Sequence, residues 1–243
     1  MIKFFRKIKQ NLLTENKFNK YLLYAGGEIV LVVIGILIAL SINNANENDK
    51  LRQKEITLLT EMGQNLTVDL LDLEYNIKGN TSRTLANETV LAALTSRTPM
   101  HDSLKGHYGG IFGNFQLSEN AAAWATLKSV GLDLISNDSL RNTITNLYTV
   151  KYEYLENVES GVDDSYQWNI MYPQILEHIN IEQLWISAEP VDHEELMDNR
   201  KFQETLKMNL FMRKYVQTMY SNLYENINKV LNQIENHIQT LTK

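Results

Sequence analysis

The feature that most constrains this chain is an uninterrupted apolar run near the N-terminus. From Ile29 to Leu40 the sequence reads IVLVVIGILIAL, without a polar side chain. A helix over residues 21–42 would be roughly 33 Å long, which matches a hydrocarbon core of about 30 Å. The pattern therefore predicts one transmembrane helix at residues 21–42.

The charges are divided unevenly by this run. Residues 1–20 hold six basic side chains and one acidic one, a balance of +5, whereas the whole chain has a net charge of −6, which leaves −11 for the rest. Because Lys and Arg concentrate on the cytoplasmic side of a membrane, residues 1–20 are predicted to be cytoplasmic and residues 43–243 to lie across the membrane. A cleaved signal peptide is the rival interpretation, but Glu15 and Glu28 in a long N-terminal region favour an uncleaved anchor.

The basic N-terminal segment is also amphipathic. Its apolar residues share one helical face, with basic residues around the rest, as in a short helix lying on an anionic inner leaflet. The alternative is a basic flank that only sets topology. The predicted membrane-surface contacts are Lys3, Arg6, Lys7 and Lys9.

A second membrane feature is the face that contains Glu28. This carboxylate lies within or at the edge of the predicted span, where a charge is costly unless it meets protein or water. Gly35 and Ala39 form a small-x-x-x-small pattern, which lets helix backbones approach closely. The predicted helix–helix interface is therefore Glu28, Gly35, Ala39 and Ile42. A protonated or snorkelling Glu28 on a lone helix remains the alternative.

Beyond Asn44 the pattern is helical. Apolar residues at steps of three, four or seven predict one long helix that ends before Pro99, and another stripe runs from Phe202 to Leu241. Between them Asn137 is a candidate N-cap for a helix that runs toward Tyr166 or beyond. We expect an all-α chain: a single N-terminal transmembrane helix followed by an elongated antiparallel helical bundle of three long helices plus short ones.

The connecting segments are predicted from their breakers. A proline and four glycines indicate a loop over residues 97–116, after which Ser118 is a candidate cap for a short helix that Gly131 ends. Pro173 is expected to break or restart the middle helix. A second loop is expected over residues 185–192, and no strand is predicted.

Two stretches resemble a known family. The N-terminal FFRKIKQNLLTENKFNKYLLYAGGEIVLVVIGILIALSINNANE is similar to an uncharacterised family of small single-pass inner-membrane proteins of Gram-negative bacteria, and LKSVGLDLISNDSLRNTI is a second match. The sequence departs from the family at Gly26, usually bulky and apolar, and at Ala45, usually Trp. The resemblance implies an inner-membrane location with residues 43–243 in the periplasm, and it carries no activity or catalytic residue.

Candidate chemical sites are sparse. The chain has no cysteine, which excludes disulfides and thiolate chemistry. The pair His101-Asp102 together with His107 could bind a metal, but no third ligand follows at standard spacing. The run His193-Glu194-Glu195 lacks the second histidine of the H-E-x-x-H motif. No metal and no cofactor is therefore predicted, and an enzyme is not expected. For His101 and His107, a surface loop with solvated histidines is the favoured interpretation.

Three functions remain to be compared. The first is a structural or interaction protein, an oligomerising scaffold or an accessory subunit of an envelope complex, whose partners are membrane lipids and another copy or a membrane protein. The second is a ligand-sensing periplasmic module, for which Trp124, Tyr152 and Trp168 are candidate pocket residues. An enzyme is the third and the least favoured. No basic patch exists beyond the membrane flank, so nucleic acid is not an expected partner.

Overall fold

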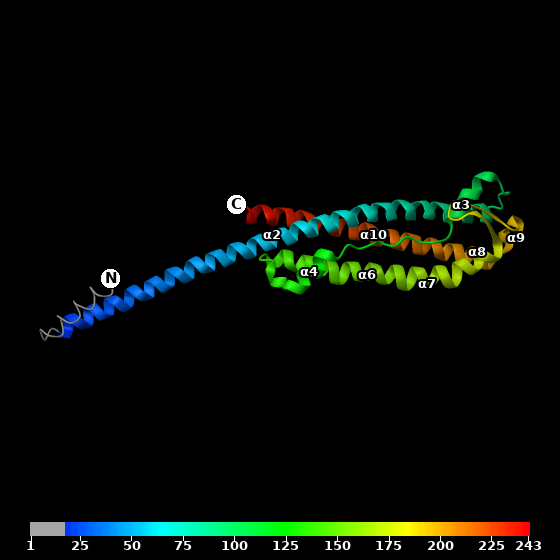
Figure 1. Cartoon of the computed structure of the whole chain (residues 1–243). Coiled ribbons are helices and arrows are strands. Elements are labelled where there is room, and N and C mark those ends of the chain that lie inside the picture. The colour runs from blue at the N-terminus through cyan, green and yellow to red at the C-terminus, as the bar shows by residue number, and fades with distance from the viewer. Residues whose placement is uncertain (1–17) are drawn as a thin grey trace. The chain divides into compact units, whose positions relative to one another are not determined.

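A computed structural model describes residues 18–243, and they are almost entirely helical (Figure 1). The chain divides into two compact units, Met1–Lys54 and Glu55–Lys243, which we describe separately. The predicted all-α class is confirmed.

The first unit consists, in its described part, of the beginning of helix α2, which covers Phe18–Thr95. All side chains from Ile29 to Leu40 are exposed. In the described part of the chain one helix is long and apolar enough to cross a membrane, and its best window has a mean hydropathy of 2.5 with none of it buried. The predicted span at residues 21–42 lies within α2.

The second unit contains three long helices. They are the part of α2 that follows Glu55, a middle helix over residues 138–178, and α10, Arg200–Leu241. Tyr224 donates to Glu74 at 2.9 Å, and His237 lies 2.8 Å from Glu55. Residue numbers therefore rise along α2 as they fall along α10, so these two helices are antiparallel, as expected.

The middle helix runs parallel to α2, whereas an antiparallel bundle was expected. Ser136 donates its N–H to Glu55 at 2.8 Å, and Tyr152 donates its hydroxyl to Asp69 at 2.5 Å. A parallel neighbour requires the chain to return along the bundle first. That return is the extended segment that Figure 1 shows between helix α3 (Lys105–Gly110) and helix α4 (Ala122–Val130).

The middle helix is built from α-helical and π-helical turns in alternation. One row of its buried residues recurs at every fourth position from Leu155 to Ile175. In a regular α-helix each step of four drifts by about 40°, so five steps would turn this row by about 200° and out of the core. The wider π-turns correct this drift. The segments are α5 Asp138–Asn146, η3 Leu147–Tyr152, α6 Glu153–Glu156, η4 Asn157–Asp163, α7 Asp164–Tyr166, η5 Gln167–Met171 and α8 Tyr172–His178.

Of the two helix caps predicted from the sequence, one is confirmed. Asn137 accepts from the Leu140 N–H, as predicted, and Asn199 accepts from the Phe202 N–H at the start of α10. The prediction for Ser118 is wrong, because α4 begins at Ala122 without a side-chain cap. The backbone N–H of Ser118 is instead bonded to Asp72 on α2.

The connecting segments hold more structure than the sequence indicated. The expected loop at residues 97–116 contains two short helices, and Pro173 does not end the middle helix because it occupies the first turn of α8, directly after a π-segment. The prediction that the chain has no strand is wrong, because a two-stranded hairpin follows α8. These elements are η1 Asp102–Leu104, α3 Lys105–Gly110, η2 Leu132–Leu134, β1 Ile179–Gln183, β2 Ser187–Pro190 and α9 His193–Asp198.

The hairpin and α3 pack closely, and a glycine permits it. Ile179 pairs with Pro190 in the antiparallel register, and the register shifts between Ile181 and Gln183. A Cβ at Gly109 would lie 2.6 Å from the backbone of Ile186. A residue with a side chain would therefore separate α3 from the hairpin.

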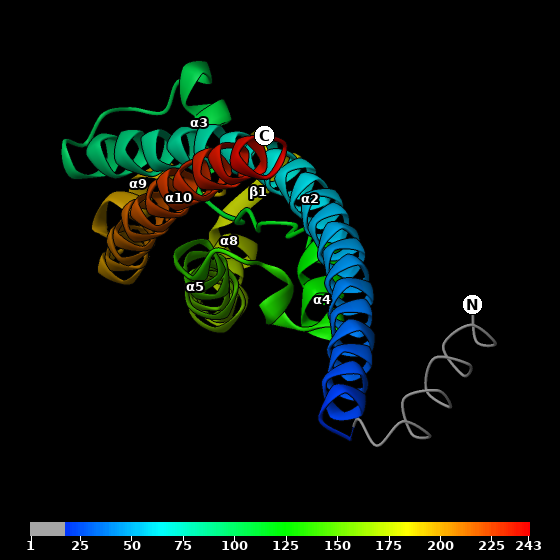
Figure 2. The same cartoon turned by 90° about the vertical axis from the view of Figure 1, so that its left-hand side faces the viewer.

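Apolar residues form two core clusters in the second unit. One lies among α2, α4, the middle helix and α10. There the Tyr148 ring stacks between Trp124, with centroids 5.0 Å apart, and Tyr152, at 5.2 Å. The other lies around α3 and the hairpin and includes Tyr108 and Phe112. Figure 2 shows α4 beside the middle helix, which is seen nearly end-on.

A Gly79→Ala substitution is expected to destabilise the protein. A Cβ at this position would lie 2.2 to 2.6 Å from the Phe115 ring, which is itself in edge contact with Tyr75. Overpacking of this kind costs about 1–3 kcal/mol, more than the roughly 1 kcal/mol that alanine gains over glycine in a helix. The free energy of unfolding can be measured by urea titration of the full chain in detergent.

Gly63→Ala is the matched control, because Gly63 lies in the same helix as Gly79. A Cβ at Gly63 would meet only the Leu231 side chain, at an ordinary contact distance of 3.8 Å. It should stabilise by about 0.5–1 kcal/mol. Equal effects of the two substitutions would contradict the close packing at Gly79.

Candidate functional site

The most unusual feature of the second unit is an extended segment that lies against the three long helices. This segment, residues 111–121, is called the strap. It follows α3, leads into α4, and has no regular secondary structure. Ile111 and Phe112 at its start are fully buried. Because a buried backbone must satisfy its N–H and C=O groups, the strap needs hydrogen-bond partners from the helices.

Helix α2 supplies many of them from a polar stripe. Asn76 donates to the Gln116 carbonyl at 3.0 Å, Asp72 accepts from the Ser118 N–H at 2.8 Å, and Asp69 accepts from the Asn120 N–H at 2.9 Å. The stripe members are spaced by three or four residues and therefore share one helical face. They are Asn65, Asp69, Asp72, Asn76, Asn80, Arg83 and Asn87.

The middle helix binds the strap from another side. Gln167 accepts from the Gly113 N–H at 2.9 Å, and Glu159 accepts from the Leu117 N–H at 3.0 Å. Both side chains are buried and both lie in π-helical segments. The wider turns place Glu159, Asp163 and Gln167, at intervals of four, on the face that meets the strap.

Helix α10 completes the enclosure. The Tyr220 hydroxyl lies 2.9 Å from the Phe115 carbonyl and 2.7 Å from a Glu159 oxygen. Asn209 donates to the Ile111 carbonyl at 2.7 Å and to Asn87 at 3.0 Å. These contacts reach main-chain atoms of the strap, so they hold an extended backbone largely without regard to its side chains.

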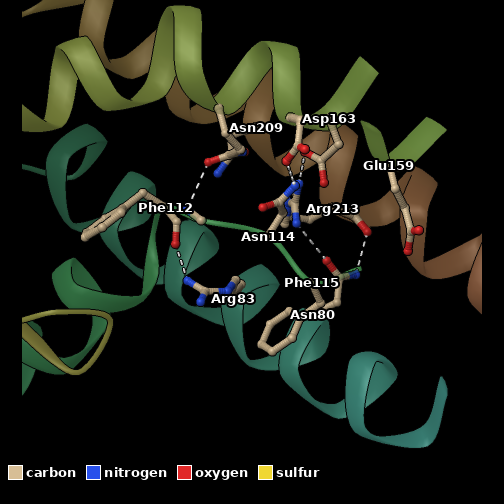
Figure 3. A network of polar contacts seen from close by, with 12 residues as sticks. Asn80, Arg83, Phe112, Asn114, Phe115, Glu159, Asp163, Asn209 and Arg213 are labelled. Atoms are coloured by element: carbon tan, nitrogen blue, oxygen red, sulfur yellow. Dashed lines mark hydrogen bonds and ion pairs between the residues drawn. The ribbon is translucent and has the colours of Figure 1, made fainter. Parts of the chain in front are cut away.

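A buried ion pair joins the helices at the centre of this network (Figure 3). Figure 3 shows the Arg213 guanidinium between Asp163 of the middle helix and Asn80 of α2. Arg213 and Asp163 are essentially inaccessible to water and in direct contact. Asn80 also donates to the Arg213 carbonyl at 2.8 Å, so the three long helices meet here through one arginine. Removing either charge would leave the other buried and unpaired.

A second buried guanidinium also holds the strap. Arg83 donates to the Phe112 carbonyl, and its guanidinium carbon lies 4.9 Å from the centre of the Phe115 ring. Burial is the main factor that lowers the pKa of Arg83, to about 10, and the neighbouring Arg213 charge adds to this effect. Arg83 therefore still carries its charge at neutral pH.

Burial also alters the carboxylic acids that hold the strap. It raises the pKa of Glu159 to about 7, although the hydrogen bonds from Tyr220 and the Leu117 N–H oppose the effect. Burial likewise raises the pKa of Asp69, against the hydrogen bonds from Tyr152 and Asn120. Glu159 is thus a buried acid that titrates near neutrality.

The network consists of hydrogen bonds that hold the strap against the helices. The carboxylates of the network accept from fixed donors, and amides and guanidinium groups occupy the space between them. In residues 18–243 no three His, Asp or Glu side chains lie close enough to hold a metal ion. The His101 ring bonds to Ser103 at 2.6 Å, and the His193 ring bonds to Tyr108 and the Thr98 carbonyl.

The residues predicted for the membrane lie apart from this network. Glu28, Gly35, Ala39 and Ile42 are exposed on α2 in the first unit, and a Cβ at Gly35 would meet nothing within 4 Å. The interface that they are predicted to form stays a prediction. Lys3, Arg6, Lys7 and Lys9 lie outside the described residues.

The aromatic residues predicted to line a pocket do not converge. Trp124 and Tyr152 stack on either side of Tyr148 within the core. Trp168 is instead exposed on the middle helix, where its ring lies 4.7 Å from that of Tyr172. These three residues therefore form no common binding surface.

Sequence reasoning missed the strap and its polar network. The signal was present in α2, where seven residues with amide, carboxylate or guanidinium groups repeat at helical spacing from Asn65 to Asn87. Polar residues that repeat at helical spacing form a continuous stripe along one face of the helix, and such a stripe can bind a buried segment. The four-residue repeat of the middle helix was the second available signal.

Comparison with known proteins identifies a family. A model described as a family of unknown function, DUF6090, matches residues 28–166. The match covers more than half of the chain, so the protein belongs to this family, and the expected resemblance to an uncharacterised family is confirmed. The matched region includes the apolar segment, the polar stripe, the strap and much of the middle helix. No curated protein matches the chain, and no solved structure does.

A Glu159→Gln substitution should flatten the pH dependence of stability. The folded pKa is raised from 4.5 to about 7, so the folded protein holds this proton more tightly than the unfolded chain. The free energy of unfolding should therefore be greatest below the unfolded pKa and fall as the pH rises to about 7, by on the order of 3 kcal/mol. Urea titrations between these pH values measure the slope.

The exposed Glu61 on α2 provides the control. Glu61→Gln should keep the wild-type slope. A Glu159→Gln protein with an unchanged slope would show that Glu159 is not the group responsible.

Proposed function

We propose that this DUF6090 protein is a single-pass inner-membrane protein of a Gram-negative bacterium that acts through binding to other proteins. Residues 1–20 would lie in the cytoplasm and residues 43–243 in the periplasm. The protein would serve as an oligomerising scaffold or as an accessory subunit of an envelope complex. The observation that carries the proposal is the apolar segment of α2, whose side chains are all exposed from Ile29 to Leu40.

This segment supports a membrane anchor because exposing its apolar side chains to water is unfavourable. Twelve consecutive residues without a polar side chain form a continuous apolar surface, far larger than the apolar patches common on soluble monomers. A helix satisfies its own backbone hydrogen bonds and is therefore suited to lipid. A membrane would cover the surface that the described part of the chain leaves open.

The charge distribution supports the orientation. The six basic side chains in residues 1–20, directly before the apolar segment, are typical of a cytoplasmic flank. Lys3, Arg6, Lys7 and Lys9 would then contact anionic lipids of the inner leaflet, at about 1 kcal/mol for each basic side chain near the surface.

The face of Glu28, Gly35, Ala39 and Ile42 supports a role in association. The open space around Gly35 gives a second helix access to the backbone. Lipid offers no hydrophobic drive for helix pairing, so close backbone packing at small residues is a main source of association energy. A partner would also give Glu28 a hydrogen-bonded environment.

The polar network of the second unit supports a binding role over catalysis. Its buried groups hold the strap and the helices in a fixed arrangement, as the contacts of Glu159 and Arg213 illustrate. A rigid body of this kind is suited to presenting surfaces to a partner.

Single cysteines can test the topology, since the natural chain has none. Lys201→Cys should react with a membrane-impermeant maleimide in cells whose outer membrane has been permeabilised. Lys9→Cys should react only after the inner membrane is lysed. The reverse pattern would overturn the orientation, and recovery of the protein in the soluble fraction would overturn the anchor.

Association can be tested by native mass spectrometry of the full chain in mild detergent. We expect oligomers or a co-purifying membrane protein from wild type, and Gly35→Leu should weaken the association by about tenfold because the side chain separates the helices. Val33→Leu adds bulk on the opposite face and should have little effect. A wild-type monomer without a partner would contradict the proposal.

A further inference from the structure

The second unit has a surface groove between the middle helix and α10. Its volume is about 480 Å³, within the range of small-molecule sites. One wall comes from α5 and η3 of the middle helix and the other from Asn226 to Val230 of α10. Leu147 and Val230 are buried and form its apolar part, while the remaining lining residues are polar.

The groove is positively charged in an otherwise acidic unit. Lys151 stands on one wall and Lys229 on the other, and none of the lining residues is acidic. Within residues 18–243 neither ammonium group forms a hydrogen bond or an ion pair. By contrast, Lys105 contacts two glutamates and Lys214 contacts Glu88 at 2.7 Å. An anion in the groove would neutralise two like charges at once.

Neutral polar groups lie between the two lysines. Asn142 and Asn146 stand one turn apart on the same wall, and Ser139 lies one turn before Asn142. The side chains of Asn142 and Asn146 are exposed and form no hydrogen bond with another described residue. An amide both donates and accepts, so this wall matches a molecule that carries several hydroxyl groups.

The local backbone adds a further indication. Leu147 and Lys151 both belong to η3, a π-helical segment. Turns of this type occur frequently at functional sites. The pair spans one wide turn, with Leu147 in the apolar part of the groove and Lys151 beside it.

We infer that this groove binds an anionic sugar, with the two lysines on its charged group and the asparagines on its hydroxyls. The apolar part formed by Leu147 and Val230 would meet the carbon face of the sugar ring. This site lies entirely in the second unit and does not depend on the proposed anchor or on association.

Isothermal titration calorimetry of the full chain in detergent can test the site, with glucose 6-phosphate as the probe. Saturable binding with a dissociation constant of about 1 mM or tighter is expected. Lys151→Gln and Lys229→Gln should each weaken it by about tenfold, the effect of one charge-assisted hydrogen bond. Added salt should weaken binding as well.

Two comparisons make the result specific. Lys201→Gln removes another exposed lysine of α10 outside the groove and should leave the affinity unchanged. Glucose and inorganic phosphate should each bind more weakly than the sugar phosphate. Thermal unfolding of each variant verifies that it is folded.

Several results would overturn the inference. They are the absence of saturable binding, binding that survives both groove substitutions, equal losses with Lys201→Gln, and an affinity for inorganic phosphate equal to that for the sugar phosphate. None of these results bears on the oligomeric state or topology, so the two proposals fail separately.

Discussion

An extended backbone cannot be buried among helices unless its N–H and C=O groups find partners, and this requirement organises the second unit. The strap meets it with side chains from all three long helices, for example Asn76, Glu159 and Tyr220. Its presence explains why the middle helix runs parallel to α2. It also explains why one face of α2 carries amides and carboxylates at positions where a simple bundle would have leucine.

The same requirement accounts for the charges at the centre. Arg213 contacts Asp163 and Asn80, so a single side chain connects the three helices, and its burial is tolerated because its partners are fixed. The π-segments keep Glu159, Asp163 and Gln167 on one face across two turns. The cost is a buried acid, Glu159, that titrates near neutral pH.

The functional proposals concern the two units separately. In the first unit the exposed apolar side chains from Ile29 to Leu40 and the open face at Gly35 are features that a membrane and a second helix would cover. In the second unit the strap network joins the three long helices, and the proposed binding groove with Lys151 and Lys229 lies on the surface of this unit. The match to DUF6090 begins at Glu28 and extends through the strap, so it includes features of both units.

The sequence alone determined what depends on neighbouring residues. The apolar segment, the all-α class, the end of α2 before Pro99, the cap at Asn137 and the long C-terminal helix all follow from periodicity, capping and breakers, which act within a few residues. Tertiary structure alone decided the rest. Ser118 is held by Asp72 instead of capping a helix, and Pro173 continues one after a π-segment. The strands that pair after α8 were not predicted. The strap is held by side chains that lie 24 to 105 positions away from it in the sequence and bind its backbone. Such contacts join positions far apart in sequence, and local propensities do not contain them.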